Sequence, residues 1–90
     1  MEITLEQALQ QGVAAHKAGK LQDAERLYRA ILKSQPLHPD ANHNLGVLAM
    51  RSNKIEAALP LFKTAVETKP IIEQFWLSYI EALITGNQLY

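Results

Sequence analysis

The sequence contains no cysteine, and this absence excludes several kinds of protein. Without cysteine the chain has no disulfide framework, no thiolate zinc site and no cysteine nucleophile. A chain of 90 residues buries only about 60–65% of its unfolded surface, so its hydrophobic core is thin and has no covalent reinforcement. The architecture must therefore use its apolar residues economically.

The chain also lacks an excess of charge of either sign, with nine basic residues against nine acidic ones. Net neutrality removes the general electrostatic attraction toward nucleic acid or an anionic membrane. No stretch approaches the ~18 apolar residues of a membrane span, and the segment Met1–Glu6 is acidic where a signal peptide is basic. We therefore expect a soluble cytoplasmic protein with no nucleic-acid or membrane partner.

Recognisable catalytic and metal-binding motifs are missing too. The three histidines, His16, His38 and His43, do not have the spacing of metal ligands in motifs such as HExxH. The Gly19-Lys20 pair does not fit the spacing of a phosphate-binding loop, and no Ser/His/Asp combination occurs in a supporting motif. We therefore expect no metal, no cofactor and no enzymatic activity in this chain.

What the sequence does contain is an internal repeat with a period of about 34 residues. Sliding the chain against itself by this distance, the repeat length, brings like residues together at more positions than chance explains. The clearest matches place Gly12 on Gly46, Ala24 on Ala58, Tyr28 on Phe62 and Pro36 on Pro70. Such a repeat indicates an array of small supersecondary units.

Each repeat unit has the pattern of two helices. In the first unit Thr4 and Gln7 form a capping box, apolar residues recur at helical spacing up to Gly19, and a second apolar stripe follows. In the second unit Pro39 suits the first position of a helix and Asn53 marks the turn between two stripes. The sequence thus predicts five helices of about 12–16 residues each.

The repeat also predicts where the units begin and end. They are expected to span residues 5–38, 39–72 and 73–90 within a single domain of residues 1–90. The third unit stops soon after its first helix, and only a stub, Gln88–Tyr90, remains of its second. We therefore expect the chain to be a fragment of a longer array.

These features resemble the tetratricopeptide repeat, a helix–turn–helix unit of the same length with the signature W-x2-L-G-x2-Y, A-x3-F and P. The second unit carries Leu45-Gly46, and Trp76 of the third unit occupies the Trp slot. The resemblance implies an all-α fold of antiparallel helix pairs stacked as a right-handed superhelical solenoid. The expected structural signature comprises Gly12, Ala24, Tyr28, Pro36, Gly46, Ala58, Phe62 and Pro70.

The same resemblance implies a concave groove, lined by the first helix of each pair, that binds an extended peptide or a helix of a partner protein. The lining is mixed, which suits a peptide better than a small charged metabolite. The expected groove residues are Leu9, Gln10, Val13, His16, Lys17, His43, Asn44, Val47, Met50, Arg51, Leu77, Ser78, Glu81 and Ile84.

Asn44 invites two narrower comparisons. Some family members bind acidic chaperone tails through a clamp of Lys, Asn and Arg, but only Asn44 matches that clamp, so we do not expect such binding. The string Ala41–Leu48 resembles the repeats that precede O-linked N-acetylglucosamine transferases and related bacterial repeat proteins, in which asparagines at this slot hydrogen-bond a substrate's backbone. Gln10 and Ser78 take the equivalent places here. Alternatively, Asn44 is solvated or caps a neighbouring loop.

The principal hypothesis is a non-catalytic scaffold that binds a protein in its groove. The resemblance to the repeats that precede O-linked N-acetylglucosamine transferases gives a second hypothesis. In it, the chain is the N-terminal substrate-recruiting segment of a larger enzyme such as a glycosyltransferase. A third hypothesis is a self-association module.

The third hypothesis arises because the third unit is apolar on more than one face, whereas repeat arrays normally end in a polar cap. A following helix would cover the face formed by Trp76, Tyr79, Ile80 and Leu83 in a longer array. Alternatively, this helix docks back and is covered as it stands, or the face is a self-association surface. We expect the isolated chain to form a homodimer through this helix.

Two further features need an explanation. Pro60 falls inside the second helix of the second unit, where it removes a backbone hydrogen bond, and we expect a slight kink or a late start of the regular helix there. A functional hinge is the alternative. Arg26, Arg29 and Lys33 share one side of a helix, and nearby acidic residues balance them. We expect a solvated outer face there rather than a phosphate-binding stripe.

Overall fold

The computed structural model describes residues 3–87, and within them the chain forms five α-helices and no strand. The helices have 13 to 15 residues each. In chain order they are α1 (Leu5–Lys17), α2 (Leu21–Ser34), α3 (Pro39–Arg51), α4 (Ile55–Thr68) and α5 (Glu73–Asn87). The predicted all-α fold of five helices is confirmed, while the expected stub Gln88–Tyr90 lies outside the described residues.

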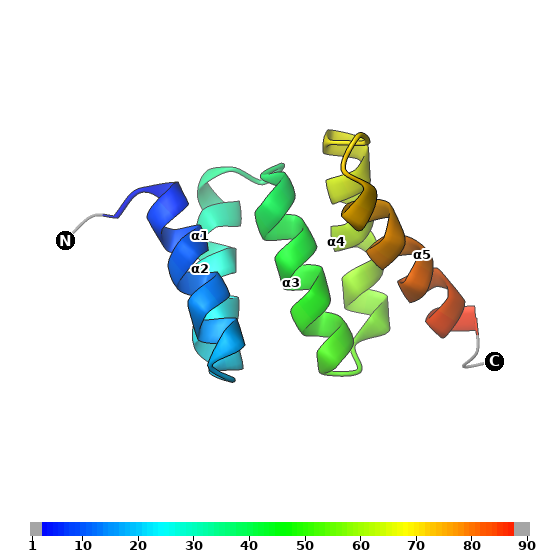
Figure 1. Ribbon diagram of the computed structural model, residues 1–90, viewed down its shortest axis with the longest axis horizontal. Helices are drawn as coiled ribbons and strands as arrows, with labels where there is room; N and C mark the ends of the chain where they lie inside the picture. Colours follow the sequence, from blue (N-terminus) through cyan, green and yellow to red (C-terminus); the bar gives the residue numbers. More distant parts are fainter. Residues whose placement is uncertain (1–2, 88–90) are drawn as a thin grey trace.

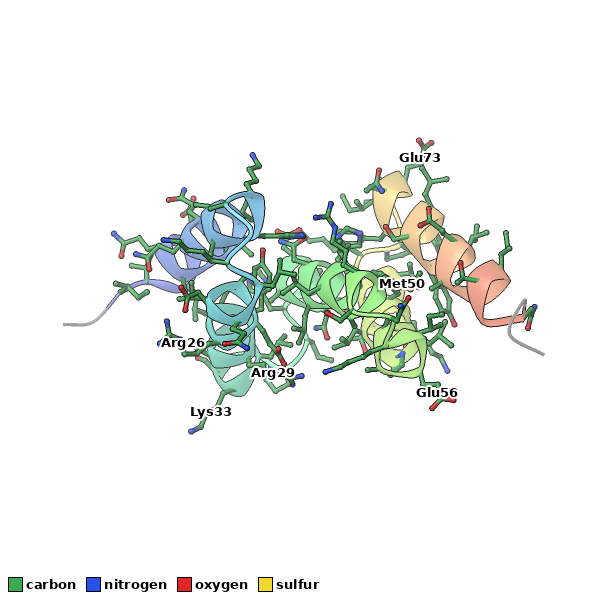
Figure 2. All side chains as sticks on the ribbon, turned by 90° about the horizontal axis from the view of Figure 1, so that it is seen from below. Arg26, Arg29, Lys33, Met50, Glu56 and Glu73 are labelled. Carbon is green, nitrogen blue, oxygen red and sulfur yellow. The ribbon has the colours of Figure 1, made fainter. Side chains whose placement is uncertain are left out.

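The helices run alternately up and down and form an elongated body of 46 × 27 × 19 Å (Figure 1). Each helix packs mainly against its neighbours in the sequence, and α3 also contacts both α1 and α5. In the view of Figure 2, which is turned by 90° from that of Figure 1, α1 and α5 lie on one side of the molecule, and α2 and α4 lie on the opposite side. The first helices of successive pairs therefore line one face of the molecule together.

Two helices begin with side-chain caps at positions one repeat length apart. The predicted capping box is present: Thr4 Oγ1 accepts from the backbone N–H of Gln7 at 3.0 Å, and Gln7 Oε1 accepts from the N–H of Thr4 at 2.9 Å. At the equivalent place before α3, His38 Nδ1 accepts from the N–H of Ala41 at 3.1 Å, and Pro39 occupies the first helical position. These caps satisfy backbone donors that the helix itself leaves unpaired.

The two turns inside the helix pairs also share one geometry. Gly19 and Asn53, which occupy equivalent positions in the two repeats, have positive φ angles of 79° and 58°. In both turns the next residue donates its N–H to a carbonyl five positions earlier, at 2.8 Å. This is the Schellman ending of a helix, which requires a left-handed residue and so favours glycine or asparagine.

Gly12 and Gly46 allow each pair of helices to approach closely. A Cβ atom at Gly12 would lie 2.6 Å from a ring carbon of Tyr28, and one at Gly46 would lie 2.6 Å from a ring carbon of Phe62. The aromatic rings, each about 1% exposed, fill the space that a side chain at the glycine would need. Glycine at these positions is therefore a packing requirement, as the sequence predicts.

The hydrophobic core lies between the helix pairs and is built from small residues at the closest contacts. Ala24 and Ala58, two of the expected signature residues, are completely buried. The largest fully buried side chains are Tyr28, Phe62, Ile31 and Val66. Pro36 and Pro70 follow the ends of α2 and α4 and are exposed. All eight predicted signature residues thus lie at helix contacts or helix ends.

The entries into α3 and α5 share a side-chain hydrogen bond. Asn42 is nearly buried and its Nδ2 donates to the carbonyl of Pro36 at 3.0 Å. At the equivalent position of the next unit, Trp76 Nε1 donates to the carbonyl of Pro70 at 2.7 Å. Different side chains therefore close the same loop in two successive units.

Helix α4 continues through Pro60 from Ile55 to Thr68. The proline is exposed and lies a little over one turn in from the helix start. Its carbonyl accepts from Thr64 Oγ1 at 3.0 Å. The regular helix therefore does not start late, which removes one of the two structural explanations that the sequence left open.

The length and hydropathy of the helices show whether any of them could span a membrane. In the part of the chain that the structure describes, none of the helices is both long enough and apolar enough to cross a membrane.

Candidate functional site

A cleft lies between α1 and α3 on the face that the first helices line. Its volume is about 390 Å³. It is lined by Val13, His16, Lys17, Tyr28, Asn44 and Arg51. Five of these residues belong to the groove expected from the sequence, while Tyr28 was expected only as a packing residue.

Helical spacing places the lining residues on one side of each helix. Val13, His16 and Lys17 are three and four residues apart on α1, so they neighbour one another. Asn44 and Arg51 are seven residues apart on α3, which is close to two full turns. The cleft therefore forms where the amphipathic faces of the parallel helices α1 and α3 lie side by side.

The cleft carries positive charge that no described acidic residue balances. Lys17 and Arg51 are exposed and occupy equivalent positions in the two repeats, each in the last turn of its helix. A cation there also compensates the negative end of the helix dipole. The two ion pairs found among residues 3–87 both lie within α2, so neither Lys17 nor Arg51 is paired with another described residue.

His16 adds a neutral polar group to the same cleft. Burial lowers the pKa of its imidazole, and the positive charge of Arg51 lowers it further. Its Nε2 is buried and has no hydrogen-bond partner among the described residues. An unpaired buried nitrogen carries a cost for the fold, and because this atom is closed to solvent it offers no contact to a ligand in this conformation.

Tyr28 forms the floor of the cleft and reaches it from α2. Burial raises the pKa of its phenol, and the neighbouring Asn44 side chain opposes this shift in part. Asn44 is half-buried and is turned toward the interior of the repeat. Sequence reasoning missed Tyr28 as a cleft residue because it counted Tyr28 only among the structural signature residues.

His43 is not the free groove residue that the sequence led us to expect. It is only 9% exposed, and its ring lies 4.8 Å from that of Phe75 in a stacked arrangement and 5.6 Å from that of Phe62. Burial lowers the pKa of its imidazole, against smaller opposing effects of Asn44 and Asp40. The approach of α5 covers this side chain, so it packs α3, α4 and α5 together instead of facing a ligand.

A short hydrogen-bond network joins His43 to its neighbours. His43 Nδ1 lies 3.3 Å from Asn44 Oδ1, and Nε2 lies 2.8 Å from Ser78 Oγ. These distances fit a neutral ring that donates from Nδ1 and accepts at Nε2. Gln74 Nε2 also donates to Ser78 Oγ at 3.4 Å. Asn44 and Ser78 are therefore engaged within the protein, while Gln10 is exposed.

The remaining expected groove residues do not join the cleft. Leu9 and Gln10 line an adjoining hollow of about 350 Å³ along α1, which shares Val13 and Lys17 with the cleft. Val47 and Met50 are partly buried against the core between α3, α4 and α5. The others, Leu77, Glu81 and Ile84, are exposed on α5. The structure thus gathers five of the expected residues into one cleft, while others are exposed on α1 or α5 or are engaged in packing within the protein.

Other features of the described surface have simpler structural explanations. The predicted basic stripe extends from α2 on the side of the molecule away from α1 (Figure 2). Arg26 pairs with Asp23 at 3.4 Å and Arg29 pairs with Glu25 at 2.8 Å. A second hollow of about 230 Å³ between α2, α3 and α4 is lined by that same Glu25–Arg29 pair and by Lys54.

The three histidines lie in separate environments. His38 caps α3, His43 is stacked between aromatic rings, and His16 lines the cleft. Within residues 3–87 no group of three His, Cys, Asp or Glu side chains is placed to hold a metal ion.

A comparison with protein families identifies the repeat. The family model for the tetratricopeptide repeat matches residues 9–71, which is more than half of the chain. The chain belongs to the tetratricopeptide repeat family. Such repeats generally mediate protein–protein interaction and are typically non-catalytic. No curated protein sequence matches the chain significantly.

The region that matches the tetratricopeptide repeat model includes the cleft but not the last helix. Both α1 and α3, which carry the cleft, lie largely within residues 9–71, as do α2 and α4. Helix α5 follows the matched region. The cleft therefore lies within the matched region, and α5 follows that region.

Proposed function

We propose that this protein binds a segment of a partner protein, as an extended peptide or a helix, along the face formed by α1, α3 and α5. The cleft of about 390 Å³ between α1 and α3 carries this proposal. Membership of a family that generally mediates protein–protein interaction supports it. No catalytic role is proposed for the chain itself.

The cleft favours a partner segment with an acidic residue next to an apolar one. Lys17 and Arg51 supply two charge-assisted donors for a carboxylate, and neither is neutralised by another described residue. Val13 offers an apolar contact beside them.

A peptide-display selection on the immobilised protein tests this directly. We expect the selected peptides to be enriched in Asp and Glu, and their affinity to fall as salt is raised. The double variant Lys17→Ser/Arg51→Ser should weaken binding roughly fivefold or more, which corresponds to about 1 kcal/mol. The double variant Lys33→Ser/Lys63→Ser removes the same charge from α2 and α4 and should stay within about twofold of wild type.

Selected peptides without acidic residues would contradict the proposed chemistry of the cleft. Equal weakening by both double variants would show that only net charge matters. Failure to select any peptide, with a correctly folded protein on the surface, would contradict the binding function itself.

A second candidate is a substrate-recruiting segment of a larger enzyme such as a glycosyltransferase, in which Asn44 binds the substrate's backbone. The presence of Asn44 in the cleft supports this candidate, although its Oδ1 already faces His43 Nδ1. Under this candidate Asn44→Ala should weaken all selected peptides alike, whatever their sequence. Under the first candidate the loss should follow the acidic residue and the pair Lys17 and Arg51.

A further inference from the structure

The outer face of α5 is the most apolar exposed surface among the described residues. Seven of the nine exposed large hydrophobic side chains fall between residues 71 and 84. We define the α5 outer face as Trp76, Leu77, Ile80, Leu83 and Ile84, which are 39–53% exposed. Helix α5 also buries Phe75 and Ala82 on its inner side. A helix that is apolar on both sides is typical of one covered from both sides.

A second helix packed on α5 in the way that α2 packs on α1 does not fit this face. Ile80 occupies the position that Gly12 and Gly46 hold in the two complete repeats. At those glycines a Cβ atom would already lie 2.6 Å from the ring of Tyr28 or Phe62. The branched side chain of Ile80 keeps a following helix from packing in the same way. The α5 outer face is therefore suited to a partner other than a following helix of the same repeat geometry.

The α5 outer face is arranged symmetrically about its central residue. Trp76 and Ile84 lie four positions on either side of Ile80, and Leu77 and Leu83 lie three positions on either side. If a second α5 packs antiparallel with a two-fold axis at Ile80, Trp76 meets Ile84 of the second copy and Leu77 meets Leu83 of the second copy. Every apolar residue of the face then has an apolar counterpart, which is what an isologous interface requires.

The charges on α5 favour the antiparallel direction. The helix carries Glu73 and Glu81 and no basic residue. In the antiparallel register Glu73 meets the neutral Asn87 of the second copy. A parallel pair would place Glu73 against the same residue of the second copy, with no cation on α5 to offset the repulsion.

We propose that two copies of this chain associate through their α5 outer faces, antiparallel and with the two-fold axis at Ile80. This surface does not include the cleft between α1 and α3, so the dimer goes beyond the proposed binding at that cleft. It does include Leu77 and Ile84, so the dimer would cover the α5 part of the proposed binding face and leave the cleft open. Helix α5 has 15 residues and is about 22 Å long, so the interface lies at the small end of the range. We expect a dissociation constant of about 1–100 µM.

Molecular mass in solution, measured across concentrations up to about 0.5 mM, tests the association. The wild-type chain should approach twice its mass of 10.1 kDa. Ile80→Glu should remain a monomer with an unchanged helical circular-dichroism spectrum. Leu37→Glu, at a leucine that is 67% exposed in the loop between α2 and α3, should dimerise like wild type. A monomeric wild type, or an unchanged dimer in Ile80→Glu, would overturn the proposal.

Cross-linking tests the orientation, because the natural chain contains no cysteine. In the antiparallel dimer, Leu77→Cys mixed with Leu83→Cys should form an intermolecular disulfide on oxidation. Each variant alone should not, since the two cysteines would lie six residues, or about 9 Å, apart along the axis, beyond the ~7 Å limit for a disulfide. Cross-linking of each variant alone, or none in the mixture, would overturn the antiparallel arrangement.

Discussion

His43 shows how one polar side chain can occupy an apolar place. Its ring stacks on Phe75 and contacts Phe62, while both nitrogens are hydrogen-bonded to Asn44 and Ser78. Burial penalises the charged imidazolium and lowers the pKa of the imidazole below 6.5. The folded protein therefore favours the neutral form, and the unfolded chain takes up the proton first as the pH falls.

This difference makes stability depend on pH. The stabilisation from neutral His43 is fully present above the unfolded pKa of 6.5 and is lost as the pH falls below it toward the folded pKa. We expect the free energy of unfolding, measured with urea, to decrease between about pH 7.5 and about pH 5. His43→Gln should reduce this decrease, because glutamine does not titrate in that range.

His16 provides the comparison for that measurement, since the pKa of its imidazole is lowered as well. The double variant His16→Gln/His43→Gln should show the smallest decrease. A decrease in His43→Gln as large as that of wild type would contradict the assignment of His43 to a buried, neutral state.

The burial of His43 was hidden from sequence reasoning for a specific reason. Its equivalents one repeat length away on either side are Leu9 and Leu77, so the repeat marks this slot as apolar. The register of the repeat placed all three residues in the groove, and it does not show which of them the next helix covers. How closely α5 covers α3 depends on contacts between units, and a helical wheel of α3 alone does not contain them.

At the scale of single elements, the sequence predicts much more. The helix ends could be located because caps and turns require particular residues: Thr4 with Gln7 before α1, Gly19 and Asn53 in the turns. The helix crossings could be located because only glycine fits beside a buried aromatic ring. Both requirements are local in sequence, which is why a single chain reveals them.

The cleft was predictable in part by the same reasoning. Val13, His16 and Lys17 share a face of α1 by spacing alone. Their meeting with Asn44 and Arg51 depends on the lateral approach of α1 and α3. The contribution of Tyr28 depends on how far a ring from α2 reaches between them. Spacing along a helix predicts the shared face on α1, but it predicts neither the approach of α3 nor the reach of the Tyr28 ring.

Helix α4 carries a residue that opposes its own stability. Pro60 has no N–H for the carbonyl of Glu56 and its ring is exposed. We expect Pro60→Ala to raise the free energy of unfolding, by up to about 3 kcal/mol, because the hydrogen bond is restored and alanine has high helix propensity. Chemical denaturation with urea measures the change.

The exposed substitution Glu67→Ala in the same helix serves as the control, since it alters the surface without adding a backbone donor. Its effect should stay within about 0.5 kcal/mol. A less stable Pro60→Ala protein would contradict this account and would show that the bend or ring of the proline contributes to packing.

For the whole molecule, the decisive property is that contacts run between neighbours. Among the described residues, α1 contacts α2 and α3, and α5 contacts α3 and α4, but α1 and α5 do not touch. In such an arrangement stability is approximately a sum over units and the contacts between adjacent ones. The two ends of the molecule can therefore open independently.

Hydrogen exchange measured by mass spectrometry tests this independence. Tyr28→Ala removes the ring between α1 and α2, at a cost of about 3–5 kcal/mol for a buried aromatic residue. We expect protection to fall in α1 and α2 and to persist in α4 and α5. Phe62→Ala, the equivalent change in the second repeat, should instead expose α3, α4 and α5.

Equal loss of protection in all five helices after Tyr28→Ala would contradict this expectation. It would show that the chain unfolds as one cooperative unit, in spite of its linear set of contacts.

The hydrogen bond from Trp76 to the carbonyl of Pro70 has a practical consequence for spectroscopy. Trp76 is the sole tryptophan of the chain, and it lies on the α5 outer face, held against the loop that precedes the helix. Its fluorescence emission therefore reports on the C-terminal end of the array, whereas circular dichroism averages over all helices. A difference between the denaturation midpoints of the two signals would measure how much the stability of the C-terminal end differs from that of the whole array.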